Sequence, residues 1–218
     1  MAAAAGQRPM NEPAPRALMP PYLVLNDFLP EETAAGLLDF ALAHETAFEP
    51  TKTGHRAGGG VDPEMRVSVG TRDLGPFKPV LKSAVLGLLP DLIARLGATP
   101  VGSARVELQL VAHNDGAFYK RHTDTQTAPD RRSIRVLSGV YYFHARPKAF
   151  TGGALRLYAI GDPDKKTFVD VEPTHNSLLV FPSWAPHEVT PIRCPSARFA
   201  DSRFAVNCWV YRKAEQAI

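Results

Sequence analysis

The chain has 218 residues, 25 basic and 22 acidic side chains, and a formal net charge of +3. This length suits a single domain, and 44% hydrophobic residues suffice for a buried core. Such a mild charge argues against nucleic acid or an anionic membrane as the main partner, because those binders usually carry a strong basic patch. The sequence predicts no membrane-spanning stretch and no signal peptide.

Two cysteines, Cys194 and Cys208, are too few for a disulfide framework or a zinc signature. Free thiols in a reducing compartment are the simplest interpretation, so we expect a cytoplasmic protein. Residues 1–18 are rich in alanine and proline and are expected to form a disordered tail. Residues 19–218 are expected to form one domain, with helical support over 30–97 and a β core over about 104–212.

The first elements are a strand over residues 22–25 and a helix that opens at Pro30, where proline and the acids after it favour a first turn. Residues 50–64 are rich in glycine, which indicates a flexible segment that is either a linker or a lid over a site. Residues 65–71 are predicted to form a further strand.

A long helix is predicted after residue 76, because apolar side chains recur at helical spacing. Pro90 is a potential kink, and Gly97 is expected to end the helix. We expect the helix to pack on the outside of a sheet through a stripe formed by Phe77, Val80, Leu81, Ala84, Val85, Leu88, Leu89, Leu92 and Leu96.

From residue 104 onward the pattern is that of strands. Val106, Leu108 and Leu110 alternate with polar residues, as in a half-buried strand. Further strands are predicted over residues 134–143, 154–160, 167–171, 177–181 and 204–211. Many short strands separated by glycine and proline indicate a sandwich or jelly roll, so the expected fold is mainly β with supporting helices (α+β).

His122 and Asp124, together with His187, which follows 63 residues after Asp124, form a candidate metal-ligand set. Two imidazoles and one carboxylate make the facial triad of non-haem Fe(II) oxygenases, which leaves one face of the iron open. Positions i and i+2 of an extended strand point the same way, so His122 and Asp124 could share a metal. His187 would then arrive from a distant strand. Arg203 follows His187 after sixteen residues.

The segments around these residues carry a family resemblance. Residues 22–212 resemble the prolyl 4-hydroxylase-like branch of the 2-oxoglutarate- and Fe(II)-dependent dioxygenases, most specifically from residue 111 onward. The matching blocks stand in the family's order and cover residues 119–124, 140–143, 152–157, 169–173, 186–189 and 203–209.

The resemblance implies a double-stranded β-helix (jelly roll, cupin-like) core and catalytic iron held by His122, Asp124 and His187. It further implies 2-oxoglutarate and O2 as cosubstrates and leaves room for ascorbate as an additional cofactor. Arg203 is implied as the anchor for the distal carboxylate of 2-oxoglutarate, through two parallel hydrogen bonds from its guanidinium. Arg198 competes for this role.

Tyr142 matches the family tyrosine that reaches the same carboxylate, and Tyr141 is expected to point the opposite way. His113 stands near a position where the family usually has tyrosine, and it is either a cofactor-binding replacement or a core histidine. We interpret Leu155 and Trp209 as pocket walls and Gly152-Gly153 as a tight turn near the site. The other histidines, expected to be structural or exposed, are His44, His55, His144 and His175.

The implied reaction is hydroxylation of an unactivated C–H bond with release of succinate and CO2. A prolyl residue in a peptide or protein is the favoured substrate; a free amino acid, a small natural product or a non-catalytic sensor role are the alternatives. Asp124 argues against a halogenase, because halogenases have a small residue at that position. It also argues against a cupin, which would need a histidine in place of Asp124. A nucleic-acid demethylase would add an arginine where Trp209 stands. We expect a peptide, protein or small-molecule substrate as partner, without nucleic acid or membrane; the oligomeric state is open.

Overall fold

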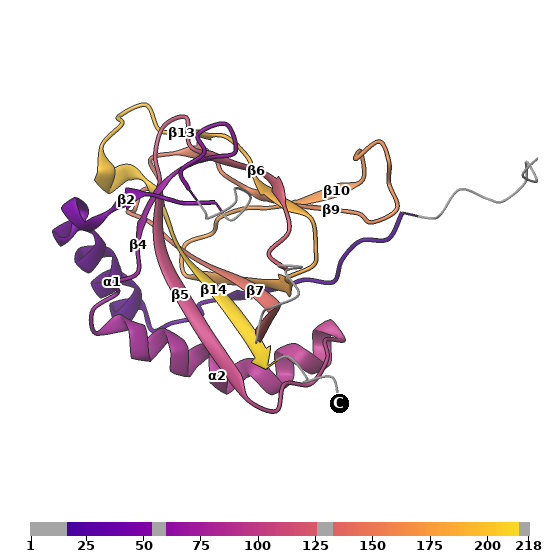
Figure 1. Ribbon diagram of the computed structural model, residues 1–218. Coiled ribbons are helices and arrows are strands. Elements are labelled where there is room, and N and C mark those ends of the chain that lie inside the picture. Colours follow the sequence, from indigo (N-terminus) through magenta and orange to yellow (C-terminus); the bar gives the residue numbers. More distant parts are fainter. Residues whose placement is uncertain (1–16, 54–59, 126–132, 214–218) are drawn as a thin grey trace, which may run out of the picture.

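The computed structural model describes residues 17–53, 60–125 and 133–213 (Figure 1). Two α-helices precede a β-rich core, α1 (Glu31–Ala43) and α2 (Phe77–Leu96). Two short 3-10 helices span Glu45–Ala47 and Phe199–Asp201. Within the described part of the chain, neither these helices nor any other is both long and apolar enough to cross a membrane.

A seven-stranded antiparallel sheet, here called the large sheet, forms the base of the domain in the order β1-β11-β7-β14-β5-β4-β2. β14 lies between β7 and β5 and pairs with both along most of its length. The strands are β1 (Leu23–Asn26), β11 (Ser177–Pro182), β7 (Ser133–Phe143), β14 (Arg203–Lys213), β5 (Ala104–His113), β4 (Val69–Thr71) and β2 (Glu49–Pro50).

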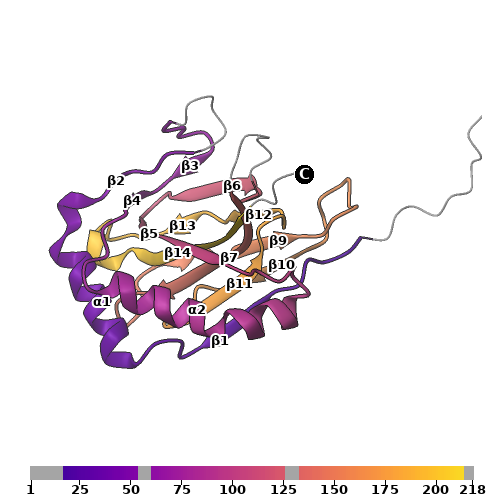
Figure 2. The ribbon, with the colours of Figure 1, turned by 60° about the horizontal axis from the view of Figure 1, so that its bottom comes forward.

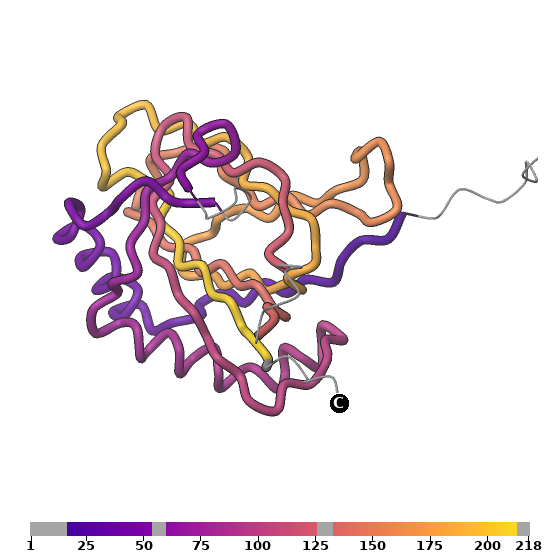
Figure 3. The backbone as a smooth tube through the Cα atoms, in the orientation of Figure 1, coloured from indigo at the N-terminus to yellow at the C-terminus, as the bar shows by residue number. Residues whose placement is uncertain are grey.

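A second antiparallel sheet, the small sheet, has the order β10-β9-β12-β6-β3. Its strands are β10 (Phe168–Val171), β9 (Leu155–Tyr158), β12 (His187–Val189), β6 (Phe118–His122) and β3 (Arg66–Val67). A ribbon of β8 (Thr151–Gly152) and β13 (Ile192–Arg193) completes the β structure of the described residues. The β9–β10 hairpin projects from the body of the domain (Figure 3).

The two helices cover one face of the large sheet (Figure 2). The predicted α2 stripe is largely confirmed, because five of its leucine and valine side chains are buried in the core: Leu81, Val85, Leu89, Leu92 and Leu96. Each contributes on the order of 1.5–3 kcal/mol from burial. Val80 was wrongly included, since it is 43% exposed. The helix continues through Pro90 and ends at Gly97, whose φ of +61° is left-handed.

The other face of the large sheet packs against the small sheet through a separate apolar cluster. The two neighbouring tyrosines on β7 point to opposite faces of the large sheet, as expected. Tyr141 lies in the helix-side core, where its hydroxyl donates to Asn176 Oδ1 over 2.9 Å, whereas Tyr142 lies in the cluster between the sheets. Two facing antiparallel sheets with helices on one outer face confirm the expected jelly roll with supporting helices.

Two boundaries differ from the sequence predictions. Residues 65–71 do not form one strand, because the chain passes from the small sheet to the large sheet at Ser68, between β3 and β4. Leu18, assigned to the tail, exchanges two backbone hydrogen bonds of 2.9 Å with Ile160. Residues 1–16 and 54–59 lie outside the described residues, so the tail and the linker-or-lid alternative remain predictions.

Candidate metal centre

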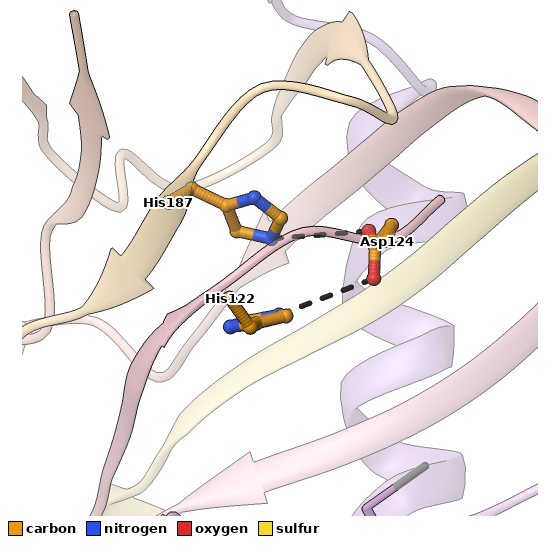
Figure 4. Close-up of side chains that lie close together, drawn as sticks. All are labelled: His122, Asp124 and His187. Atoms are coloured by element: carbon orange, nitrogen blue, oxygen red, sulfur yellow. Dashed lines mark ion pairs between the residues drawn. The ribbon is translucent and has the colours of Figure 1, made fainter. Parts of the chain in front are cut away.

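The predicted metal ligands come together where the small sheet opens toward the large sheet (Figure 4). His122 ends β6 and His187 begins β12, and the antiparallel register pairs these two residues directly. Asp124 is not on the strand, contrary to the i and i+2 argument, but in a bend after it. Its backbone N–H and that of Thr125 donate to Ser183 O over 2.9 and 3.0 Å. This contact between distant segments, rather than strand alternation, brings the carboxylate to the imidazoles.

Hydrogen bonds fix which nitrogen each imidazole presents. Nδ1 of His122 lies 2.8 Å from Lys120 O, and Nδ1 of His187 lies 2.8 Å from Ala185 O. Since a carbonyl only accepts, both rings carry their proton on Nδ1 and turn the Nε2 lone pair inward. These Nε2 atoms lie 3.9 and 3.8 Å from the two Asp124 carboxylate oxygens. One donor atom from each residue falls within 4.8 Å of the others, which is spacing for a shared ion.

Asp124 is oriented by side chains of the large sheet. Its Oδ2 accepts hydrogen bonds from Ser138 Oγ at 2.6 Å and from Trp209 Nε1 at 3.0 Å. Arg135 Nη1 lies 3.8 Å from Oδ1. Sequence reasoning treated Trp209 as a wall of the pocket and did not single out Ser138. The hydrogen bond from Trp209 to Asp124 could have been suspected from the sequence, because a buried Trp N–H needs an acceptor and Trp209 is on the same predicted strand as Arg203.

The protonation states suit a metal site. Burial, reinforced by the neighbouring His187, lowers the pKa of His122 to about 3, so this imidazole is neutral at pH 7. Burial raises the pKa of Asp124, but the nearby histidines, Ser138 and Arg135 outweigh it and the net direction is downward. Neutral imidazoles and an ionised carboxylate are the forms that bind a divalent ion.

A second polar group lies around Arg203 at the start of β14. Its Nε donates to Gly153 O over 2.8 Å, and its Nη1 lies 3.3 Å from His113 Nδ1. Because Nδ1 accepts from the guanidinium, the neutral His113 ring carries its proton on Nε2. The guanidinium carbon lies 4.8 Å from the centre of the Tyr142 ring. Burial raises the pKa of the Tyr142 hydroxyl to about 12, so it remains a donor.

Three buried donors in this group have no hydrogen-bond partner among the described residues: Arg203 Nη2, His113 Nε2 and the Tyr142 hydroxyl. An unsatisfied buried donor costs about 1–3 kcal/mol, so such a cluster is expected to serve a ligand. Such donors suit a ligand carboxylate, which accepts hydrogen bonds. The group therefore fits the distal carboxylate of 2-oxoglutarate.

Gly153 makes the approach of Arg203 possible. Its φ is +74°, and a Cβ built on it would lie 2.7 Å from Arg203 Cδ. Gly152 is equally constrained, since its Cβ would lie 2.2 Å from Pro191 O. Both glycines have left-handed φ angles where the chain leaves β8, and the Gly153 carbonyl lies against the guanidinium.

Arg198, the competing candidate, lies elsewhere. Its side chain is 73% exposed and pairs with Asp201, with Nη2 2.8 Å from the carboxylate. Arg203 instead lines a cavity of about 630 Å³ together with His113 and the three candidate ligands. Leu155 and Trp209 line it too, as predicted.

The remaining predictions agree with the described residues. His144 and His175 pack against each other with ring centres 5.2 Å apart, and His44 is exposed. His122, Asp124 and His187 are the one cluster with metal-ligand spacing within residues 17–53, 60–125 and 133–213. His55 lies outside these ranges. Both cysteines are free and buried.

Comparisons with known proteins agree with this geometry. Residues 108–211 match the family described as the 2OG-Fe(II) oxygenase superfamily. A stretch of 142 residues, 62% of the chain, is 39% identical to an uncharacterized PKHD-type hydroxylase of Synechocystis sp.. The chain spans only 45% of the length of that curated relative.

Two solved structures have a similar fold. A Pseudomonas putida prolyl-4-hydroxylase shares 24% identity at a TM-score of 0.62, over 88% of this chain and 93% of that one. A Trichoplax adhaerens prolyl hydroxylase, solved with a hypoxia inducible factor peptide fragment, shares 22% identity at a TM-score of 0.64, over 87% and 83%.

The jelly roll, the candidate ligand set and the match over residues 108–211 agree with a 2-oxoglutarate- and Fe(II)-dependent oxygenase domain. Proteins of this class use Fe(II), 2-oxoglutarate and O2, and the donor set and the unsatisfied donors around Arg203 fit the metal and the cosubstrate. The chain is similar to that class over residues 108–211, and the two prolyl hydroxylase structures share its fold.

Proposed function

We propose that this protein is a dioxygenase that hydroxylates an unactivated C–H bond, with a prolyl residue in a peptide or protein as its substrate and succinate and CO2 as coproducts. The observation that carries the proposal is one cavity with two complementary groups. The His122, Asp124 and His187 donors suit Fe(II), and Arg203 and His113, which line the same cavity with unsatisfied buried donors, suit a carboxylate.

The protein's own residues have separate tasks in this proposal. His122, Asp124 and His187 would hold the metal, which together with 2-oxoglutarate supplies the oxidising power to place oxygen on carbon. Ser138 and Trp209 orient Asp124 through its Oδ2. The buried sheets exclude water and fix the substrate's direction of approach.

Arg203, Tyr142 and His113 would hold the distal carboxylate of the cosubstrate. The guanidinium is fixed through Nε to Gly153 O, which leaves its Nη2 for the ligand. Burial, together with Arg203, lowers the pKa of His113 well below its ordinary value, so the ring stays neutral and donates from Nε2. In this arrangement His113 takes the place of the family's tyrosine.

The prolyl substrate rests on similarity. Both solved structures described above are named as prolyl hydroxylases, and one was solved with a peptide. Hydroxylation of a free amino acid or of a small natural product is the alternative, as is a non-catalytic iron and 2-oxoglutarate sensor.

The first experiment is anaerobic addition of Fe(II) and 2-oxoglutarate to metal-free protein. A weak visible charge-transfer band of the chelated keto acid is expected. Iron binding without a band would contradict the dioxygenase proposal and favour a cupin-like or sensor role. Succinate formation in air, even uncoupled from a substrate, separates an enzyme from a sensor.

Arginine variants test the anchor. Arg203→Ala should weaken 2-oxoglutarate binding by about 2–5 kcal/mol, because a buried charged contact is lost. The matched control is Arg198→Ala, whose side chain is exposed and should leave the band and its titration unchanged. The reverse result would exchange the two assignments. Turnover with free amino acids and none with prolyl peptides would overturn the peptide substrate.

A further inference from the structure

Arg66 is a buried arginine in the same cavity that the proposed assignments do not use. It is 6% exposed and lies on β3, the edge strand of the small sheet, paired with Tyr119 of β6. No carboxylate of the described residues lies within ion-pair distance of it. Two other cavity arginines do have one, since Arg72 pairs with Glu107 and Arg135 lies 3.8 Å from Asp124. An arginine buried without a counter-charge is costly unless a ligand supplies one.

A closed hydrogen-bond network fixes the direction of this guanidinium. Arg66 Nε donates to Ser68 Oγ over 2.8 Å. The Ser68 hydroxyl lies 2.7 Å from Thr51 Oγ1, and Thr51 Oγ1 donates to Ser68 O over 3.1 Å. This network occupies Nε, and neither Nη atom of Arg66 is hydrogen-bonded to a described residue. Arg66 lines the cavity, so its two Nη groups remain for a ligand.

A stack of three planar groups links Arg66 to the metal centre. Its guanidinium carbon lies 4.8 Å from the centre of the Tyr119 ring, and that ring stacks on His122 with centres 3.6 Å apart. Arg66 therefore stands one aromatic ring away from a candidate iron ligand. A ligand held by Arg66 would therefore lie in the cavity that the three candidate metal ligands also line.

The charge balance indicates which ligand group belongs there. Five cationic side chains line the cavity, Lys52, Arg66, Arg72, Arg135 and Arg203, against two carboxylates, Glu49 and Asp124. The cosubstrate's distal carboxylate is assigned to Arg203 on the large sheet, and its keto acid end belongs to the metal. Arg66 reaches the cavity from the small sheet, so its charge remains for a different anion.

We infer that Arg66 is a carboxylate-binding residue for the primary substrate. The substrate would be a peptide or protein whose C-terminal residue is the target proline, so that its carboxylate lies near the target carbon. A guanidinium with both Nη groups available can hold a carboxylate through two parallel hydrogen bonds. This inference rests on the proposed function and narrows its substrate class from prolyl residues in general to C-terminal ones.

A matched ligand pair tests the inference. N-acetyl-L-proline and N-acetyl-L-prolinamide differ in the carboxylate and are titrated anaerobically into full-length protein loaded with Fe(II) and 2-oxoglutarate. Binding is followed by calorimetry and by the change in the charge-transfer band. The acid should bind at least about tenfold more tightly than the amide, since hydrogen bonds to charged groups are the strong ones. Equal binding, or no binding of either compound, would overturn the inference.

Two variants assign the preference to Arg66. Arg66→Gln should abolish the acid preference and leave the 2-oxoglutarate titration unchanged. The matched control is Arg72→Gln, at a cavity arginine that already pairs with Glu107, and it should keep the preference. A preference that survives Arg66→Gln, or a weakened 2-oxoglutarate titration with the preference intact, would contradict the assignment.

A third variant guards against misfolding of Arg66→Gln. Ser68→Ala retains the guanidinium but removes the hydroxyl that fixes Nε, so it should reduce the acid preference while circular dichroism stays native. Full preference in a natively folded Ser68→Ala would contradict the orienting network. Formation of the charge-transfer band tests the proposed function separately, because it requires neither ligand of the pair.

Discussion

The large and small sheets face each other across the site but are built differently. The central strands of the large sheet have 10 or 11 residues, and β14 pairs with a long neighbour on each side. The strands of the small sheet have two to five residues. Arg203, Tyr142 and His113 belong to the first sheet, whereas His122 and His187 belong to the second.

The two sheets position their functional side chains in different ways. Long paired strands fix the backbone of the Arg203 group by register alone. The short strands bring two imidazoles together by a single pair in register, His187 with His122, and carbonyl contacts then orient each ring. Asp124, on neither sheet, is held by hydrogen bonds from the large sheet, so the metal centre depends on both halves.

The largest expected effect comes from removing a ligand on the small sheet. His187→Ala should lose stoichiometric iron and all turnover, beyond the roughly 10- to 100-fold that removing an outer hydrogen-bond partner costs. Metal analysis after anaerobic loading and gel filtration measures this. His44→Ala is the control, because His44 is exposed and bonds only its own helix. Full iron retention in His187→Ala would refute the ligand assignment.

Trp209→Phe asks whether the large sheet acts on the metal centre. The substitution keeps an aromatic ring but removes the Nε1 donor to Asp124 Oδ2. Iron affinity should fall about 10- to 100-fold, with the unfolding midpoint changed little. Combining it with Ser138→Ala should give a non-additive loss, because both donors serve one oxygen. Unchanged iron affinity would mean that the small sheet and its loops hold Asp124 in place without hydrogen bonds from the large sheet.

Gly153→Ala tests the close approach behind Arg203. The new Cβ would lie 2.7 Å from Arg203 Cδ, so overpacking of about 1–3 kcal/mol adds to the backbone strain. Gly116→Ala is a matched control, since its φ is similar at +72° but no atom lies within 4 Å of the built Cβ. Urea unfolding and 2-oxoglutarate titration should both show a larger loss for Gly153→Ala. Equal losses in the two variants would mean that backbone strain alone explains them and that the contact with Arg203 contributes nothing.

The smallest effect is a pH dependence from His113. Its folded pKa lies well below the ordinary value near 6.5, so below about pH 6.5 the unfolded state binds a proton that the folded state does not. Stability of the metal-free protein should therefore fall on acidification, by up to about 1.4 kcal/mol for each pH unit from this residue. Urea unfolding between pH 7.5 and 5.5 measures the slope. His113→Gln should make the slope shallower, while the buried His122 keeps its own contribution in the same direction. An unchanged slope would contradict the buried neutral state of His113.

Much of the fold was readable because its signals are local. The alternation of Val106, Leu108 and Leu110 predicted β5, and helical spacing predicted α2 with its end at Gly97. The division of residues 65–71 was not readable, because a sheet change at Ser68 leaves no periodic mark in so short a segment. Val80 was misassigned because a stripe drawn from spacing cannot say how wide the buried face is.

The sequence by itself predicted the chemistry of the donors: two histidines and an aspartate for a metal and, through the family resemblance, an arginine for a carboxylate. Residue types and their order suffice for that, since ligand preference is a property of side chains. Tertiary structure decided which groups meet. It turned Arg198 to solvent, placed Trp209 and Ser138 on Asp124, and left Arg66 buried beside Tyr119 without a counter-charge. Those contacts join segments far apart in the chain, so no local pattern encodes them.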